Sequence, residues 1–200
     1  MTGLDVRHRL ARAAMTPGPP SSDYDLARDV VLPEGRRLRP AAVLVGVLDR
    51  GIGPELLLTK RSSRLKHHPG QIAFPGGKVD TGDAGPEAAA LREADEEVGL
   101  YRENVEVLGT LPSHETVTGF TVTPVLGWIE GNFVPQPELG EVDEVFFAPL
   151  SYVTDPRNYV VEARRWRGQT RRYYAVPWGP YYIWGATARM LRGLSDRMTS

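Results

Sequence analysis

The segment from Gly76 to Leu100 constrains this 200-residue chain more than any other. It begins with two glycines and continues into a stretch of helical periodicity that contains Glu93, Glu96 and Glu97. At the spacing i, i+3, i+4 the three carboxylates point the same way from one helix. Like charges so arranged cost a helix roughly 0.2–0.5 kcal/mol per pair. A hard divalent cation is the simplest compensation, because such ions take carboxylate oxygens together with substrate phosphates.

The opposite side of the same predicted helix is apolar. Leu91, Ala94 and Val98 lie together on it and are expected to pack on a sheet. The alternative for the acidic side is an ordinary solvated face that Arg92 partly neutralises. The glycine turn at 74–77 favours a site instead, because glycine lets the backbone approach a ligand closely.

Composition excludes several classes of function. The formal net charge is −1, so no overall field attracts nucleic acid or a membrane surface. The chain has no cysteine, which excludes disulfides and thiol catalysis. We expect neither a signal peptide nor a membrane span, because no apolar run approaches the roughly 20 residues needed to cross a bilayer. A cytoplasmic enzyme is therefore the expectation.

The periodicity predicts one mixed α/β domain. Helices are expected at 4–16, from Pro86 to the helix-ending Gly99, and at 184–197. Strands are expected at 41–48, 55–61, 71–74, 105–111, 120–128 and 144–150, with a hairpin that pairs 159–163 with 172–176. Residues 1–37 are predicted to be a helical and extended addition, and residues 38–200 the main domain with its C-terminal helix.

Residues 76–100 resemble the Nudix box, G-x5-E-x7-R-E-U-x-E-E-x-G-U, where U is aliphatic. Arg92 to Leu100 match the second half, with Ala94 at the first aliphatic position. In the first half, Asp83 occupies the position of the expected glutamate, counted from Gly77, and one extra residue precedes Arg92.

A second block resembles one branch of that family. Leu57 to Gly77 follow the motif L-L-T-x-R-S-x3-R-x3-G-x3-F-P-G-G of the coenzyme A diphosphatases. Lys66 departs from it, because arginine is usual there. The branch also tends to carry the extra residue and the weakened first Nudix position, and Ile183 to Leu191 is similar to it as well.

The resemblance implies a Nudix-type α/β/α sandwich around a mixed β-sheet. It also implies hydrolysis of the coenzyme A diphosphate with Mg²⁺ or Mn²⁺ as the cofactor. The implied metal ligands are Glu93, Glu96, Glu97 and the carbonyl of Gly77. The implied catalytic residues are Arg92, Glu96, Glu141 and Glu144. The implied substrate-binding residues are Arg61, Arg64, Lys66, Gly76 and Lys78.

The basic residues at 61–68, which precede the two glycines, can also be interpreted from their chemistry alone. Coenzyme A carries a 3′-phosphate besides its diphosphate, so it needs more cations than a plain nucleoside diphosphate. Arginine offers a planar fork to phosphate and lysine a point charge. We expect Arg61 and one or two of its neighbours to contact phosphate. The alternative is that some of them cover the surface or pair with Asp80 and Asp83, and His67 and His68 are not expected to bind metal.

Other interpretations remain open on the sequence alone. Near Glu141 and Glu144, a solvated acidic turn is the alternative to a second cation site or a water-activating carboxylate. The substrate could instead be ADP-ribose, NADH or another nucleoside diphosphate derivative. A non-catalytic nucleotide-binding regulator is the rival from a different class. No nucleic-acid or membrane partner is expected, and both a monomer and a homodimer remain open.

Overall fold

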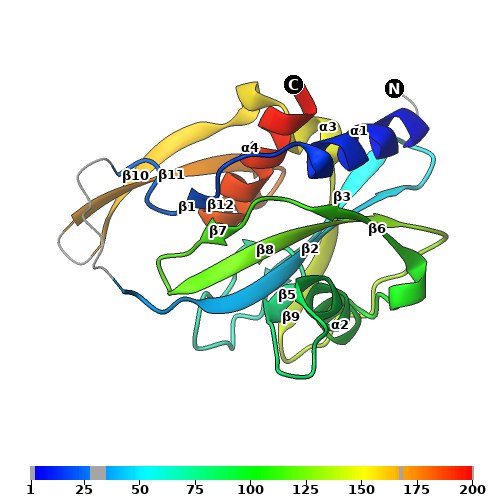
Figure 1. Ribbon diagram of the computed structural model, residues 1–200, viewed down its shortest axis with the longest axis horizontal. Helices are drawn as coiled ribbons and strands as arrows, with labels where there is room; N and C mark the ends of the chain where they lie inside the picture. Colours follow the sequence, from blue (N-terminus) through cyan, green and yellow to red (C-terminus); the bar gives the residue numbers. More distant parts are fainter. Residues whose placement is uncertain (1–2, 28–34, 167–168, 200) are drawn as a thin grey trace.

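The computed structural model describes residues 3–27, 35–166 and 169–199. Within these ranges nine strands form one mixed sheet, and the remaining three form a smaller antiparallel sheet (Figure 1). The strands of the large sheet are β1 (Ser21–Ser22), β2 (Arg39–Asp49), β3 (Pro54–Arg61), β4 (Ile72–Ala73), β5 (Gly76–Lys78), β6 (Val105–Thr110), β7 (His114–Glu115), β8 (Phe120–Ile129) and β9 (Val142–Pro149). The small sheet comprises β10 (Val160–Trp166), β11 (Gln169–Trp178) and β12 (Tyr181–Trp184).

Strand β2 is the centre of the large sheet. It runs parallel to β8, with Val43 opposite Pro124 and Val47 opposite Trp128. Its other edge is shared by two antiparallel partners, β5 along 41–43 and β3 along 47–49. Strand β3 pairs in turn with β9 and β4. Strand β2 is apolar and paired on both edges. It is therefore the buried strand that the sequence predicts.

Helices cover both faces of the large sheet, as expected for an α/β/α sandwich (Figure 1). The helix α2 (Pro86–Val98) packs on one face, where Leu44, Leu57 and Val125 meet its apolar side. On the other face lie α1 (Gly3–Met15), α4 (Ala186–Thr199) and the small sheet. Short helices α3 (Leu150–Val153), η1 (Arg102–Asn104) and η2 (Pro156–Asn158) complete the described elements.

Helix α2 begins and ends as its sequence indicates. Pro86 occupies the first turn, where the missing amide hydrogen costs nothing. Gly99 follows the last turn with φ 69°, and its amide donates to the carbonyl of Asp95 at 2.9 Å. The side chains of Leu91, Ala94 and Val98 are buried, which confirms the apolar side predicted for this helix.

The N-terminal residues are part of the core. Leu10 and Ala13 of α1 are fully buried, and Arg9 donates to the carbonyl of Met198 at the end of α4. Further along, β1 pairs with β7, and the buried ring of His114 bonds Ser21 at 2.9 Å and Asp23 at 3.1 Å. These contacts attach the predicted addition to the large sheet along most of its described length.

The expected elements occur with shifts of a few residues at their ends, and three differences stand out. The pair Gly76–Gly77 was expected to be a turn but forms most of strand β5. Strand β12 occupies the residues just before α4, which begins at Ala186 rather than at 184. The short pair β1–β7 was not predicted, because two-residue strands leave no periodicity to read. Residues 28–34 of the N-terminal addition and 167–168 of the hairpin loop lie outside the described residues.

No helix in the described part of the chain is long and apolar enough to span a membrane.

The burial of α1 predicts a measurable stability contribution. Replacing Leu10 with alanine should lower the free energy of unfolding by about 2–5 kcal/mol, because it leaves a cavity in a packed core. Leu4, which is 63% exposed on the same helix, is the matched control, and its alanine variant should change stability by less than about 0.5 kcal/mol. Urea unfolding followed by fluorescence measures both. Equal effects at the two positions would contradict an integral α1.

Candidate active site

The site is built where β5 meets the end of α2. Gly76 lies so close to β2 that a Cβ there would overlap the carbonyl oxygen of Ala42 and the Cα of Val43. Its φ is 156°, and the amide of Leu44 donates to Pro75 at 2.8 Å. Only glycine permits this approach, which places the 75–77 backbone against the carboxylate side of α2.

Glu97 is the most deeply buried carboxylate of the group. Its side chain is 4% exposed, and its Oε2 accepts a hydrogen bond from the Gly76 amide at 3.1 Å. The Nη1 atom of Arg61 lies 3.8 Å from the other oxygen. Burial raises the pKa of Glu97 to about 7, although the Gly76 amide and Arg61 both oppose the shift. A carboxylate held in this way gains most from a cation that would keep it ionised.

Glu93 lies one helical turn before Glu97 and against the second glycine. A Cβ at Gly77 would overlap the Glu93 carboxylate, so any larger residue there would displace this side chain from its present position. Burial also raises the pKa of Glu93, with Arg92 acting in the opposite direction. The two carboxylates and the Gly76–Gly77 backbone therefore converge on one small region.

Arg92 organises the acidic groups around it. Its Nε and Nη2 bond the two oxygens of Asp83 at 3.0 Å each, and its Nη1 reaches Glu93 at 3.2 Å and Glu96 at 3.1 Å. Nη2 also donates to the carbonyl of Lys78 at 3.1 Å. The hydrogen bonds with Arg92 lower the pKa of Asp83, and those with Asp83 raise the pKa of Arg92. Asp83 therefore anchors the guanidinium group of Arg92.

The three glutamates do not share one environment. Glu96 is 61% exposed and paired with Arg92, whereas Glu97 is buried and Glu93 lies between these extremes. Neutralisation by Arg92, the alternative considered for the sequence, accounts for much of the charge on Glu96. It does not reach Glu97, whose nearest cation in the described residues is Arg61.

Without a substrate, the protein groups supply only part of the ligand set that a hard divalent cation needs. Within the described ranges no three acidic or histidine side chains are gathered into a cage that could hold a metal ion. Glu93 and Glu97 nevertheless present two carboxylates beside backbone groups that have no Cβ to shield them. One or two carboxylates completed by substrate phosphates and water is the usual manner of binding Mg²⁺. The donor set therefore fits Mg²⁺ or Mn²⁺ in the presence of a phosphorylated substrate.

The basic residues follow β3 and lie on the loop that leads to β4. Arg61 ends β3 on the α2 face, and the loop is held to the start of β9 and to the segment before it. Arg64 donates to the carbonyl of Leu139 at 3.0 Å, and the Ser63 amide donates to Asp143 at 2.8 Å. Lys66, His67 and His68 on the loop are exposed, as is Lys78 at the end of β5. None of the basic loop residues shows the predicted alternative pairing with Asp80 or Asp83 among the described contacts.

The two acidic residues near the start of β9 are separated by the sheet. Glu144 lies opposite Lys60, on the face that also carries Phe146, and it accepts a hydrogen bond from the hydroxyl of Tyr181. That face is turned away from α2. Glu141 lies close enough to Glu93 and Glu97 for its charge to raise the pKa of both. The structure therefore brings Glu141, but not Glu144, to the α2 site.

Two contributors to the site carry no distinct sequence signal. Asp143 anchors the basic loop through the Ser63 amide, but in the sequence it is one of several acids in a row. The Leu139 carbonyl holds Arg64 through its backbone, which residue type does not reveal. A register shift between Lys60 and Arg61 leaves Asp143 without an opposite residue in β3.

A family model and the similar proteins both indicate the same family for this chain. A family model described as the NUDIX domain matches residues 37–167. A protein of Citrobacter koseri named uncharacterized Nudix hydrolase NudL is 45% identical over 174 residues, which cover 87% of this chain and 90% of the relative. A protein of the same name from Salmonella heidelberg is 43% identical over 175 residues, with the same two coverages of 87% and 90%.

Solved structures agree at the level of the fold. The Nudix hydrolase RenU of M. smegmatis aligns with a TM-score of 0.50 at 28% identity, covering 60% of this chain and 74% of that one. A MutT/nudix family protein of Enterococcus faecalis aligns with a TM-score of 0.53 at 16% identity, covering 100% of this chain and 75% of that one. At that identity the second match shows a shared architecture only.

The raised pKa of Glu97 predicts how the metal-free fold responds to pH. Its folded pKa of about 7 lies above its ordinary value of 4.5. The protonated form therefore stabilises the fold fully below pH 4.5, and this contribution is lost as pH rises through 7. Glu97→Gln should remove the dependence, so that above pH 8 the variant is more stable than the parent by up to about 3 kcal/mol.

Urea unfolding in a metal chelator at pH 5 and pH 8.5 measures this difference. The exposed Glu96→Gln variant is the control and should follow the parent at both values. If Glu97→Gln and the parent lose stability equally between the two pH values, Glu97 does not carry a raised pKa.

Proposed function

The chain belongs to the Nudix hydrolase family and acts on diphosphate bonds, and from that premise we propose that its substrate is coenzyme A or a close derivative. The products would be 3′-phosphoadenosine 5′-phosphate and 4′-phosphopantetheine. The observation that carries the proposal is the placement of the basic loop after β3, whose last residue, Arg61, lies 3.8 Å from Glu97. Arg64 and Lys66 on the same loop are exposed and available to a further phosphate.

Nudix hydrolases generally use divalent cations such as Mg²⁺. Here Glu93 and Glu97, assisted by Glu96 and the Gly77 carbonyl, would hold Mg²⁺ or Mn²⁺. When bound, the ion would neutralise charge on the bridging phosphates and lower the pKa of an attacking water. Arg61 and the Gly76–Lys78 strand would position the diphosphate, since arginine and backbone groups both bind phosphate oxygens.

The hydrolytic step needs a group that takes a proton from water. Water attacks one phosphorus, the bond from that phosphorus to the bridging oxygen breaks, and the bridging oxygen leaves on the other phosphate. We assign the proton to Glu141, because its charge acts on the Glu93–Glu97 pair from the start of β9. Arg92 would position Glu93 and Glu96 through its hydrogen bonds. Glu144 is left out of the mechanism because it bonds Tyr181 on the opposite face.

A second candidate substrate class is ADP-ribose, NADH or a similar nucleoside diphosphate derivative. It requires the same diphosphate site but no cations for a 3′-phosphate. The exposed cations of the basic loop favour coenzyme A over this class. A catalytically silent regulator is less well supported, because Glu93, Glu96 and Glu97 are all present. The proposal further includes a cytoplasmic enzyme, a monomer or homodimer, without nucleic-acid or membrane partners, in which residues 1–37 precede the main domain.

Removing the charge of Glu97 should abolish turnover without unfolding the protein. Glu97→Gln keeps the size of the side chain and an acceptor for the Gly76 amide, so the fold is retained. We expect kcat to fall by about 1,000-fold or more, equivalent to about 4 kcal/mol of barrier. Asp95→Asn, an exposed neighbour on α2, is the control and should keep normal kcat. Near-normal turnover by folded Glu97→Gln would remove Glu97 from the metal site.

Substrate kinetics test the role of the basic loop. Coenzyme A, dephospho-coenzyme A and ADP-ribose are compared with and without Mn²⁺, and the products are identified by chromatography. We expect Lys66→Ala to lower kcat/KM for coenzyme A by roughly tenfold, the loss of one charge-assisted contact, and to leave dephospho-coenzyme A nearly unchanged. Arg102→Gln, an exposed arginine of η1, serves as the control. Equal kcat/KM for all three substrates in the parent would eliminate the 3′-phosphate site.

A further inference from the structure

A cavity of about 200 Å³ lies on the face of the large sheet opposite to α2. Its walls come from three parts of the chain: the segment before β1, the end of β6 with Pro124 of β8, and one side of α4. Figure 1 shows α4 on this side of the sheet, beside β1 and β7. The lining residues are Pro19, Ser21, Leu111, Pro112, Pro124, Arg189, Met190, Gly193, Asp196 and Arg197. Typical ligand pockets span about 300–1,000 Å³, so this one is too small for coenzyme A or a nucleoside diphosphate.

Two guanidinium groups converge on this cavity around a glycine. Arg189, Gly193 and Arg197 are spaced four residues apart, so they share one side of α4. A Cβ built on Gly193 would lie 3.5 Å from Nη1 of Arg197 and 3.8 Å from Nη1 of Arg189. The glycine therefore leaves an open space between two like charges on one side of the helix, and an anion bound between them would relieve their repulsion.

Arg197 has no acidic partner among the residues that the structure describes. Its Nη1 donates to the carbonyl of Gly193 at 2.9 Å, and its Nη2 packs against Gly18, where a Cβ would overlap it. Its Nε is buried and lacks a hydrogen-bond partner in the described part of the chain. A buried donor left unpaired costs about 1–3 kcal/mol, and more when it is charged.

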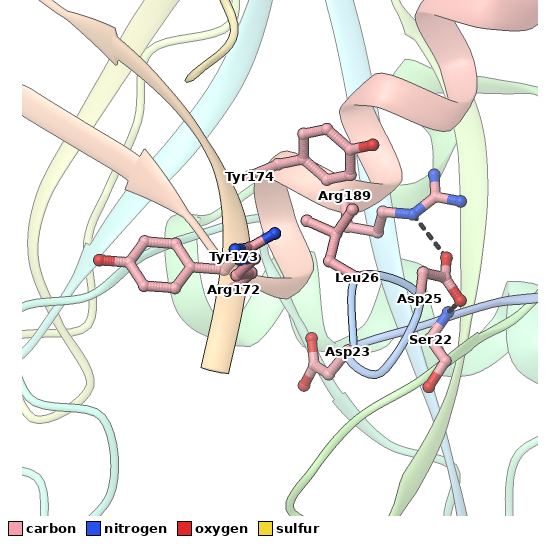
Figure 2. A pocket seen from close by; sticks show the side chains of 9 residues that line it. Ser22, Asp23, Asp25, Leu26, Arg172, Tyr173, Tyr174 and Arg189 are labelled. Carbon is pink, nitrogen blue, oxygen red and sulfur yellow. Dashed lines mark hydrogen bonds and ion pairs between the residues drawn. The ribbon is translucent and has the colours of Figure 1, made fainter. Parts of the chain in front are cut away.

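The other charged groups at the cavity already have partners. Nε of Arg189 bonds Asp25 at 2.7 Å, as Figure 2 shows from the neighbouring, much smaller pocket at Asp23 and Tyr174. Asp196, which also lines the cavity, accepts a hydrogen bond from Nε of Arg192 at 2.9 Å. With these pairs set aside, the charge of Arg197 is the one left to be balanced within the described residues.

We propose that this cavity binds a small oxyanion, a carboxylate or phosphate group that carries at most a short apolar body. Nη1 of Arg189 and the guanidinium group of Arg197 would donate to the anion, because guanidinium groups match the oxygens of carboxylates and phosphates. Leu111, Met190 and the prolines would surround an aliphatic body. The site is separate from the α2 site, and the proposal does not depend on the identity of the Nudix substrate.

Titration calorimetry of the full chain with butyrate, inorganic phosphate and butyramide tests this site. A metal chelator is present throughout, so that no cation can recruit phosphate to the α2 site, and ionic strength is held constant with chloride. We expect saturable binding of butyrate, phosphate or both, and none of neutral butyramide. Binding of butyrate alone would identify a carboxylate ligand, and binding of phosphate alone a phosphate ligand.

Gly193→Ala is the decisive variant. Alanine favours the helix, so the melting temperature should stay at or above that of the parent. The new methyl group enters the space between the two guanidinium groups and should weaken binding at least tenfold. Arg197→Gln should weaken it similarly, whereas Arg12→Gln, at an exposed arginine of α1 that does not line the cavity, should leave it unchanged.

Three results would overturn the proposal. The first is the absence of saturable binding of both anions to the parent chain. The second is equal affinity of the parent, Gly193→Ala and Arg197→Gln. The third is binding of butyramide as tight as that of butyrate, since charge would then contribute nothing.

Discussion

The close approach of Gly76 to β2 is the constraint on which the active site depends. Because no Cβ separates it from Ala42 and Val43, β5 can pair with β2 along the edge that β2 shares with β3. That pairing turns the Gly76 amide toward Glu97. The amide fixes one carboxylate oxygen and Arg61 approaches the other. A side chain at position 76 would displace β5, and the buried carboxylate would lose the contact that orients it.

Arg92 determines which of the acidic groups on α2 are compensated by a positive charge. Arg92 binds Asp83 with two hydrogen bonds and uses its remaining donors on Glu93, Glu96 and the Lys78 carbonyl. It thereby joins the loop before α2 to the helix and lowers the repulsion among the acids. Glu97 receives none of this compensation. The acid that Arg92 does not reach is also the one whose pKa burial raises to about 7, which supports its assignment as a metal ligand.

The sequence was sufficient for the long strands of the large sheet, for α2 and for the acidic side of that helix. Long apolar runs such as 41–48 and the Pro86 and Gly99 boundaries carry their own physical signal. Three things had no such signal. Strand β5 is too short for a period, and its glycines read as a turn. The placement of Asp143 depends on a register shift between β3 and β9. The positions of α1 and α4 depend on tertiary contacts between the two ends of the chain.

The two sites on the large sheet have opposite local charge and lie beside the two edges of one strand. Val43 of β2 pairs with Gly76 of the α2 site on one edge and with Pro124, which lines the α4 cavity, on the other. On the α2 face, carboxylates outnumber the arginines that reach them, so the arrangement favours a cation and, through it, a phosphate. On the α4 face, Arg197 lacks an acid among the described residues, so the arrangement favours an anion directly. A near-zero net charge therefore hides two local imbalances of opposite sign, which only the fold separates.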